Sequence, residues 1–275
     1  MRAPPGQQLN GQQLTDLLMR LLLDAPFRQR LAVEGAAAVA AGAGELECLE
    51  TVDLAELDSA ARQFRTAIWK PGRGGGISAA FPRSLRILAA AGVGDAELLT
   101  GFLRSEEFGR FRLIPHTGRG LSVEEAFASY VLGFVAAYGE RLTRAGAEAA
   151  EAVDAARAPV VLRETVTHEL MTALFTALVR EQPLSFDIAA EGIVTTGRGH
   201  AALRRYTPRS VASWADRPTA AARPERGEPV AYAYFATPAG VTRGAVSARI
   251  TAAFETTPSA EGDAARHALS GRGLW

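Results

Sequence analysis

The stretch from Phe102 to Tyr138 constrains the fold most, because it specifies two helices and the loop that joins them. Ser122 and Glu125 have the spacing of a capping box, in which each side chain accepts a hydrogen bond from the other residue's backbone N–H. From Val123 to Ala137, apolar residues recur at helical spacing and form one broad stripe. The pattern therefore predicts an amphipathic helix that packs its stripe against a core.

Helical spacing covers the chain to about residue 155, and no period-two pattern typical of strands appears there. Pro26 is expected at the first turn of a helix, and the alanine-rich run after it predicts one helix to Ala41, ended by Gly42 and Gly44. Asp53 and Pro82 mark the starts of two further helices. The N-terminal part is therefore predicted to be a helical bundle.

The pattern changes after Pro159. One more helix is predicted over residues 162–179, followed by short strands at residues 184–188 and 192–196. Residues 207–226 are rich in proline and arginine and are predicted to form a long surface loop. A strand over 230–235 and a last helix capped by Ser259 complete the pattern. We predict a mainly α protein with a smaller α+β C-terminal module, that is, a helical bundle (1–157) followed by a winged-helix-like strand-and-helix unit for partner or peptide recognition (158–275).

Composition narrows the classes of function. The 30 basic and 30 acidic residues give a formal net charge of zero, so no overall field attracts nucleic acid or an anionic membrane. The single cysteine, Cys48, excludes an internal disulfide and a cysteine-based metal site. No apolar run approaches the roughly 20 residues that span a bilayer, and the N-terminus has no apolar signal-peptide core. We therefore expect a cytoplasmic protein without a membrane partner.

Two features suggest chemistry, but each has a simpler interpretation. The glycines at 72–76 follow a predicted helix, whereas a nucleotide-binding loop follows a buried strand, so we interpret them as a connector. His168 and Glu169 begin a zinc-protease pattern, but Thr172 stands where the second histidine is required. Glu164 and His168 could supply two ligands, which do not close a metal site, and we interpret this stretch as a polar helix edge. We expect no catalytic residue, cofactor or metal.

The run from Val230 to Phe235 is the clearest strand, and Tyr232 and Tyr234 share one of its faces. Two interpretations stay open, because the position of a strand in its sheet cannot be read from one sequence. The tyrosines are half-exposed structural residues, or the strand lies at a sheet edge where a peptide adds by backbone hydrogen bonds. The candidate peptide-binding residues are Val230, Tyr232, Tyr234 and Phe235.

The predicted helices and the C-terminal run together resemble a known family. The helical segments are FRQRLAVEG from Phe27, FPRSLRIL from Phe81, GFLRSEEFGRFR and GLSVEEAFASYVLGF. They resemble the helical region of accessory proteins of multinuclear non-heme iron oxidases, which modify ribosomally made peptides. The run PVAYAYFATPAGVTRGAVSARITAAF, with the ending HALSGRGLW, is similar to the winged-helix-style module of such partners and of peptide-recognition elements.

This resemblance implies a non-catalytic accessory subunit that binds a ribosomal precursor peptide and presents it to the oxidase. The strand at 230–235 would receive the peptide, and the helical half would dock on the enzyme, with Arg112, His116 and Arg119 as candidate docking residues. The oxidase's iron ligands have no counterpart here.

Two alternatives stay open. One is a nucleic-acid-binding regulator that uses the winged module and an arginine-rich loop over residues 198–209, although the zero net charge argues against nucleic acid as a partner. The other is an enzyme with a small-molecule site around Arg112, His116 and Arg119.

Overall fold

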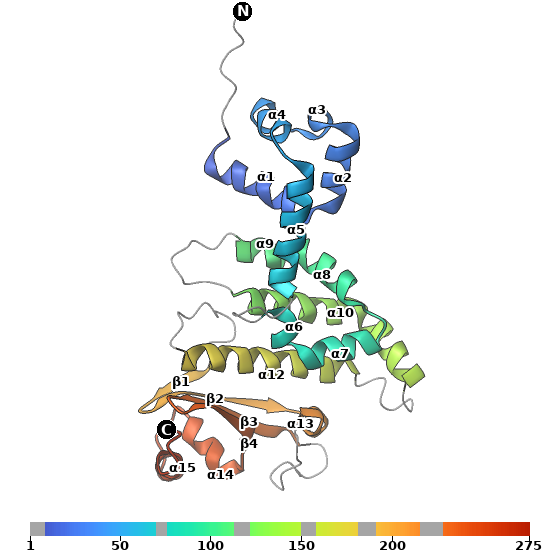
Figure 1. The fold of residues 1–275 in the computed structure, drawn as a ribbon. Coiled ribbons are helices and arrows are strands. Elements are labelled where there is room, and N and C mark those ends of the chain that lie inside the picture. Colours follow the sequence, from blue (N-terminus) through green and yellow to red (C-terminus); the bar gives the residue numbers. More distant parts are fainter. Residues whose placement is uncertain (1–8, 70–75, 113–121, 150–157, 181–190, 215–227) are drawn as a thin grey trace, which may run out of the picture. The chain divides into compact units, whose positions relative to one another are not determined.

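The computed structural model describes residues 9–69, 76–112, 122–149, 158–180, 191–214 and 228–275. The chain forms two compact units, unit 1 (Met1–Gly76) and unit 2 (Ile77–Trp275). The mainly α class with a smaller α+β part is confirmed (Figure 1). The boundary predicted between residues 157 and 158 adjoins residues outside the described ranges and stays a prediction.

Unit 1 is helical in its described part, with helices α1 (Gly11–Leu23), α2 (Ala25–Glu34), α3 (Ala36–Val39), α4 (Ala43–Glu50) and α5 (Leu54–Trp69). The predicted starts are confirmed, because Pro26 lies in the first turn of α2 and the Asp53 carboxylate accepts hydrogen bonds from the first turn of α5. The prediction of one helix from Pro26 to Ala41 is wrong. Gly35 ends α2 with a φ of 84°, a left-handed conformation that favours glycine.

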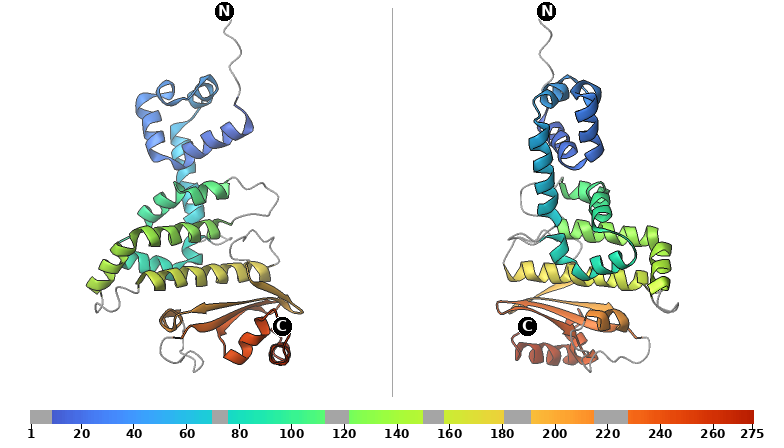
Figure 2. Two further views of the ribbon diagram at one scale, coloured as in Figure 1. Left: turned by 180° about the vertical axis from the view of Figure 1, so that it is seen from behind. Right: turned by 45° about the vertical axis from the view of Figure 1, so that its right-hand side comes forward.

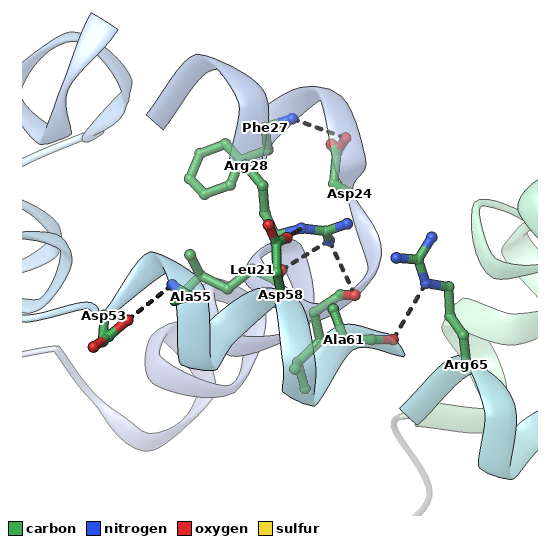
Figure 3. A network of polar contacts seen from close by, with 10 residues as sticks. Leu21, Asp24, Phe27, Arg28, Asp53, Ala55, Asp58, Ala61 and Arg65 are labelled. Atoms are coloured by element: carbon green, nitrogen blue, oxygen red, sulfur yellow. Dashed lines mark hydrogen bonds and ion pairs between the residues drawn. The ribbon is translucent and has the colours of Figure 1, made fainter. Parts of the chain in front are cut away.

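A buried arginine joins three elements of unit 1 (Figure 3). The Arg28 guanidinium donates to the carbonyl oxygens of Leu21 and Leu22 at the end of α1, at 3.0 and 3.1 Å. It also pairs with the Asp58 carboxylate of α5 at 3.2 Å. These bonds satisfy carbonyl groups that have no partner within α1 itself, so Arg28 caps one helix while it fixes another. The packed apolar residues around this junction are Leu17, Leu21, Phe27, Leu31, Leu49 and Leu57.

The helical part of unit 2 comprises α6 (Ile77–Ala80), α7 (Pro82–Ala90), α8 (Asp95–Leu103), α9 (Glu106–Arg112), α10 (Val123–Ala149) and α12 (Ala158–Val179). The predicted capping box of α10 is confirmed: the Ser122 hydroxyl accepts from the Glu125 N–H at 3.1 Å, and the Glu125 carboxylate accepts from the Ser122 N–H at 3.3 Å. The core holds the fully buried rings of Phe81, Phe102, Phe108 and Phe127. Phe102 contacts Phe127 edge to face with ring centroids 5.3 Å apart, so the predicted stripe of α10 does face a core.

Gly101 lets α8 and α10 approach closely, which leads to a prediction. A Cβ atom at Gly101 would overlap the Tyr130 hydroxyl, whereas one at Gly133 would meet no atom within 4 Å. Gly101→Ala is therefore expected to lower the free energy of unfolding by about 1–3 kcal/mol through overpacking. Gly133→Ala, in the same bundle, should raise it by up to about 1 kcal/mol because alanine favours helix. Urea denaturation followed by circular dichroism measures both, and equal effects would contradict the proposed contact.

The C-terminal part of unit 2 is a four-stranded antiparallel sheet in the order β1-β2-β3-β4. Its elements are β1 (Ile193–Thr196), β2 (Gly199–Tyr206), α13 (Pro208–Trp214), β3 (Val230–Thr237), β4 (Gly240–Ala245), α14 (Ala248–Thr251), the 3₁₀ helix η2 (Ala252–Phe254) and α15 (Ala260–Ser270). Helix α12 lies over one face of the sheet, and α14 and α15 cover the other; Figure 2 shows this order from two further sides. The second face holds Ala201, Ala233 and Phe235 against Ala265 and Leu269.

The elements of this C-terminal part agree with the sequence pattern in some places and not in others. The strands at 192–196 and 230–235 and the cap at Ser259 are confirmed. The prediction that residues 207–226 form one loop is wrong, because residues 208–214 form α13; residues 215–227 lie outside the described ranges. The strand predicted at 184–188 also lies outside them. No helix in the described ranges combines the length and apolar character needed to cross a membrane.

Candidate functional site

Helix α12 carries the side chains that suggested chemistry in the sequence. It packs against α7 and α10 on one side and against β2, β3 and β4 on another. His168 is 2% exposed and Glu169 is 5% exposed, so the interpretation of this stretch as a polar helix edge is wrong. Both residues are interior because α12 is covered on both sides.

His168 lies in a cluster of aromatic rings between α12 and the sheet. Its ring is stacked on Trp214 of α13, with centroids 4.2 Å apart and planes inclined by 4°. Tyr206 and Tyr232 contact the same imidazole edge to face, at 6.3 and 5.3 Å between centroids. The cluster therefore packs α12 and α13 against the face of β2 and β3 that carries Tyr206, Tyr232 and Tyr234.

A chain of hydrogen bonds runs through this cluster. His168 Nδ1 is hydrogen-bonded to the Tyr234 hydroxyl at 2.7 Å, and that hydroxyl is hydrogen-bonded to the Tyr206 hydroxyl at 2.9 Å. Burial, together with the charges of Arg243 and Arg83, lowers the pKa of His168 to about 3. Burial also raises the pKa of both tyrosine hydroxyls. At neutral pH all three groups are uncharged.

Two carboxylates of α12 act as helix caps for other elements. Glu169 accepts hydrogen bonds from the N–H groups of Arg83 and Ser84, at 2.7 and 3.0 Å, and from the Ser84 hydroxyl at 2.7 Å. It thereby caps α7, whose own N-cap residue makes no side-chain cap bond. Glu164 accepts in the same way from the Thr207 N–H and hydroxyl at the start of α13.

These contacts decide what the α12 cluster can do. His168, Glu169 and Tyr234 are buried, and every buried side-chain nitrogen or oxygen in the described ranges has a hydrogen-bond partner. The same ranges contain no group of three or more His, Cys, Asp or Glu residues placed to hold a metal ion. The contacts of the cluster join α12 and α13 to the sheet, and we refer to it below as the joint at His168.

Of the two interpretations left open for the strand at 230–235, the one that places it at a sheet edge is wrong. β3 is paired with β2 from His200↔Ala236 to Tyr206↔Val230 and with β4 on its other side. Val230, Tyr234 and Phe235 are 4%, 0% and 3% exposed, and Tyr232 is half-buried against His168. The interpretation of these tyrosines as structural residues fits the contacts, although Tyr234 is fully buried. A peptide cannot add to β3 because both of its edges are occupied.

The order β1-β2-β3-β4 leaves β1 and β4 at the two edges of the sheet, and the register shows which backbone groups of β4 face away from β3. The Val246 N–H donates to the Ala231 carbonyl at 2.9 Å, which makes residues 246 and 231 a hydrogen-bonded pair. Bonded and non-bonded pairs alternate in an antiparallel ladder, so Gly240, Thr242 and Gly244 bond to β3. The alternate residues of β4 are 241, 243 and 245. Their N–H and C=O groups therefore point away from β3. Among the described residues no strand pairs with this side of β4.

These three residues, Val241, Arg243 and Ala245, are the ones that sequence reasoning missed. Their alternation with glycine and threonine after Pro238 and Ala239 is a strand signal, but it does not tell an edge strand from an interior one. Arg243 stands opposite Tyr234 in the register and is exposed. Paired residues share a face, and Tyr234 is hydrogen-bonded to His168, so Arg243 lies on the α12 side of the sheet.

The other candidate residues are placed as follows. Arg112 is the last residue of α9, while His116 and Arg119 lie outside the described ranges. The run 198–209, predicted as an arginine-rich loop, forms β2 and the start of α13. Arg204 within it donates to the carbonyls of Leu203 and Glu191, so this guanidinium is committed to local contacts.

Unit 1 has a separate hollow of about 410 Å³ between the start of α1 and the loop before α4. Its polar wall residues serve local structure: Asn10 and Gln13 form the capping box of α1. Glu45 accepts from the Ala41 N–H and pairs with Arg20. The hollow therefore presents groups that already have partners.

No family model, curated protein or solved structure matches this chain. The candidate site is the side of β4 that faces away from β3, next to α12. Its geometry alone supports this choice.

Proposed function

We propose that the protein is a non-catalytic accessory subunit that binds a ribosomal precursor peptide along β4 and presents it to a multinuclear non-heme iron oxidase. The observation that carries the proposal is the row of outward N–H and C=O groups on Val241, Arg243 and Ala245. An unpaired strand edge is a template on which an extended peptide adds by main-chain hydrogen bonds. The peptide would become the fifth strand of the sheet.

The surroundings of β4 support this use. Helix α12 packs on β4 as well as on β3, so an added strand would meet both the sheet edge and the flank of a helix. The joint at His168 holds α12 against the sheet, and the cap at Glu169 holds α12 against α7. Both contacts keep α12 in place beside β4 before a peptide arrives. His168 and Glu169, the side chains that could react, are engaged in these structural contacts. We therefore assign the chemical step to the oxidase.

Amide hydrogen exchange tests the binding mode. The probe is a ribosomal precursor peptide that a multinuclear non-heme iron oxidase modifies. Its addition should slow exchange of the N–H groups of 241, 243 and 245 by tenfold or more. The N–H groups of 240, 242 and 244, already bonded to β3, should change little. Protection confined to other parts of the chain would contradict the proposal.

A double variant provides the matched control. Val241→Pro together with Ala245→Pro removes two outward donors but no hydrogen bond to β3, so the sheet should remain intact while peptide protection is lost. Circular dichroism checks the fold of the variant. For the presenting role, the oxidase should co-purify with the wild-type chain, with docking residues proposed at Arg112, His116 and Arg119. Turnover of the peptide by this chain alone would contradict that role.

A further inference from the structure

We infer that the β4 edge selects extended segments that carry an acidic side chain opposite Arg243. This inference rests on the proposed function and specifies the class of peptide that the site accepts. It is carried by two observations: the outward backbone of Arg243 and the exposed charge of the same residue.

The backbone fixes where the selected side chain must stand. Arg243 is the middle of the three outward-facing residues of β4. An antiparallel strand that bonds to its N–H and C=O places one residue directly across from it. The side chains of such a pair project to the same face, with Cβ atoms about 4.5–5.5 Å apart. A glutamate or aspartate there can reach the guanidinium.

The charges around this position favour an acid. Among the described residues no carboxylate forms an ion pair with Arg243. The carboxylates of Glu164 and Glu169 on α12 are held by N–H and hydroxyl donors at helix starts. The positive charges of Arg243 and Arg83 lower the pKa of His168, and the negative charge of Glu164 raises that of Tyr206, so charges of both signs act on this cluster. The exposed guanidinium of Arg243 itself would attract an acidic peptide side chain and repel a basic one.

The opposite face of β4 sets no comparable requirement. Its residues are Gly240, Thr242 and Gly244, which carry no charge and little side-chain volume. The selection is therefore for one acidic position with free choice at its immediate neighbours, because successive side chains alternate between faces.

A second copy of the chain is the less favourable occupant. Two β4 strands paired antiparallel about Arg243 would set the two guanidinium groups across from each other. Like charges directly opposite in a sheet are destabilising, and a charged edge residue is a common device against pairing of this kind. Arg243 thus disfavours self-association in the register that favours an acidic peptide.

A selection experiment tests the inference without knowledge of the natural peptide. Random twelve-residue peptides are displayed and selected on the full-length protein, on Arg243→Glu and on Arg249→Glu. Arg249 is an exposed arginine of α14 and serves as the matched control. Wild type and Arg249→Glu should enrich peptides that carry one acidic residue. Replacing that acidic residue of the peptide by glutamine should weaken binding to either protein about two- to fivefold. Arg243→Glu should instead enrich a lysine or arginine at that place.

The proline double variant separates the charge preference from strand addition itself. If binding is lost in Val241→Pro/Ala245→Pro but the pools show no acidic preference, the inference is overturned and the proposed function stands. If the enriched peptides still bind the double variant, both are overturned. N-methylation of the backbone of a selected peptide removes the N–H groups that would donate to β4. Loss of binding by the methylated peptide would therefore show strand addition without any change to the protein. Formation of a dimer through β4 in light scattering would also overturn the inference.

Discussion

Glu169→Ala is expected to lower the free energy of unfolding by about 3–5 kcal/mol, because it removes a buried, charged acceptor that several donors share. The alanine would leave three donors at the start of α7 without their acceptor: two N–H groups and the Ser84 hydroxyl. It would also leave a cavity beside α12. Urea denaturation followed by circular dichroism measures the change.

Two further variants separate the cap from the charge. Glu169→Gln keeps one acceptor oxygen but turns an amide NH₂ toward a donor, so about half of the loss is expected. Glu106→Ala removes an exposed carboxylate from the first turn of α9 and should cost at most about 1 kcal/mol. Equal losses for Glu169→Ala and Glu106→Ala would contradict the capping role of Glu169.

Acidification is expected to destabilise the protein through His168, by about 1.4 kcal/mol per pH unit between pH 6 and pH 4. The ordinary pKa of histidine is 6.5, and burial, with the charges of Arg243 and Arg83, lowers the pKa of His168 to about 3 in the folded chain. Between these values the unfolded chain binds a proton that the folded chain does not. Stability therefore falls as pH decreases below 6.5, and His168 adds no pH dependence above that.

Glu169 acts in the opposite direction over part of this range. Burial raises its pKa above the ordinary 4.5, so the folded chain keeps a proton longer, and its contribution to stability falls as pH rises above 4.5. The His168 effect is isolated by comparison with His168→Gln, which can still bond to the Tyr234 hydroxyl but does not titrate. Urea midpoints at several pH values should fall less steeply for this variant. His267→Gln, a substitution at an exposed residue of α15, is the matched control.

Local signals predicted helix starts well. Ser122 with Glu125, Asp53 and Ser259 cap the helices that their sequence neighbourhood indicates, because a cap is a contact within one turn. Gly35 was missed because the alanines around it favour helix on both sides. The sequence pattern does not show β2, because its buried residues include the small Ala201 and Ala202, and the half-buried Arg204 stands next to the exposed Arg205, which gives no clear period-two contrast.

The candidate site was less predictable, because it depends on pairing between distant segments. His168, Trp214 and Tyr234 belong to three elements, α12, α13 and β3, that are separate in the sequence and come together in the folded protein. Which strands lie at the edges likewise depends on how the strands pair. The residues of β3 are the more apolar and aromatic ones, which suits a strand in the interior of the sheet.

The packing of α12 on both the bundle and the sheet has an evolutionary consequence. Its buried residues Leu162, Val166, Leu170 and Leu174 lie in a helix that has bundle helices on one side and strands on the other. A gene rearrangement that moved only the strands to another protein would expose the apolar side chains on the sheet side of α12. A rearrangement that moved only the bundle helices would expose those on the other side. The two parts of unit 2 are thus expected to be inherited together, and any fusion partner must join the chain outside them.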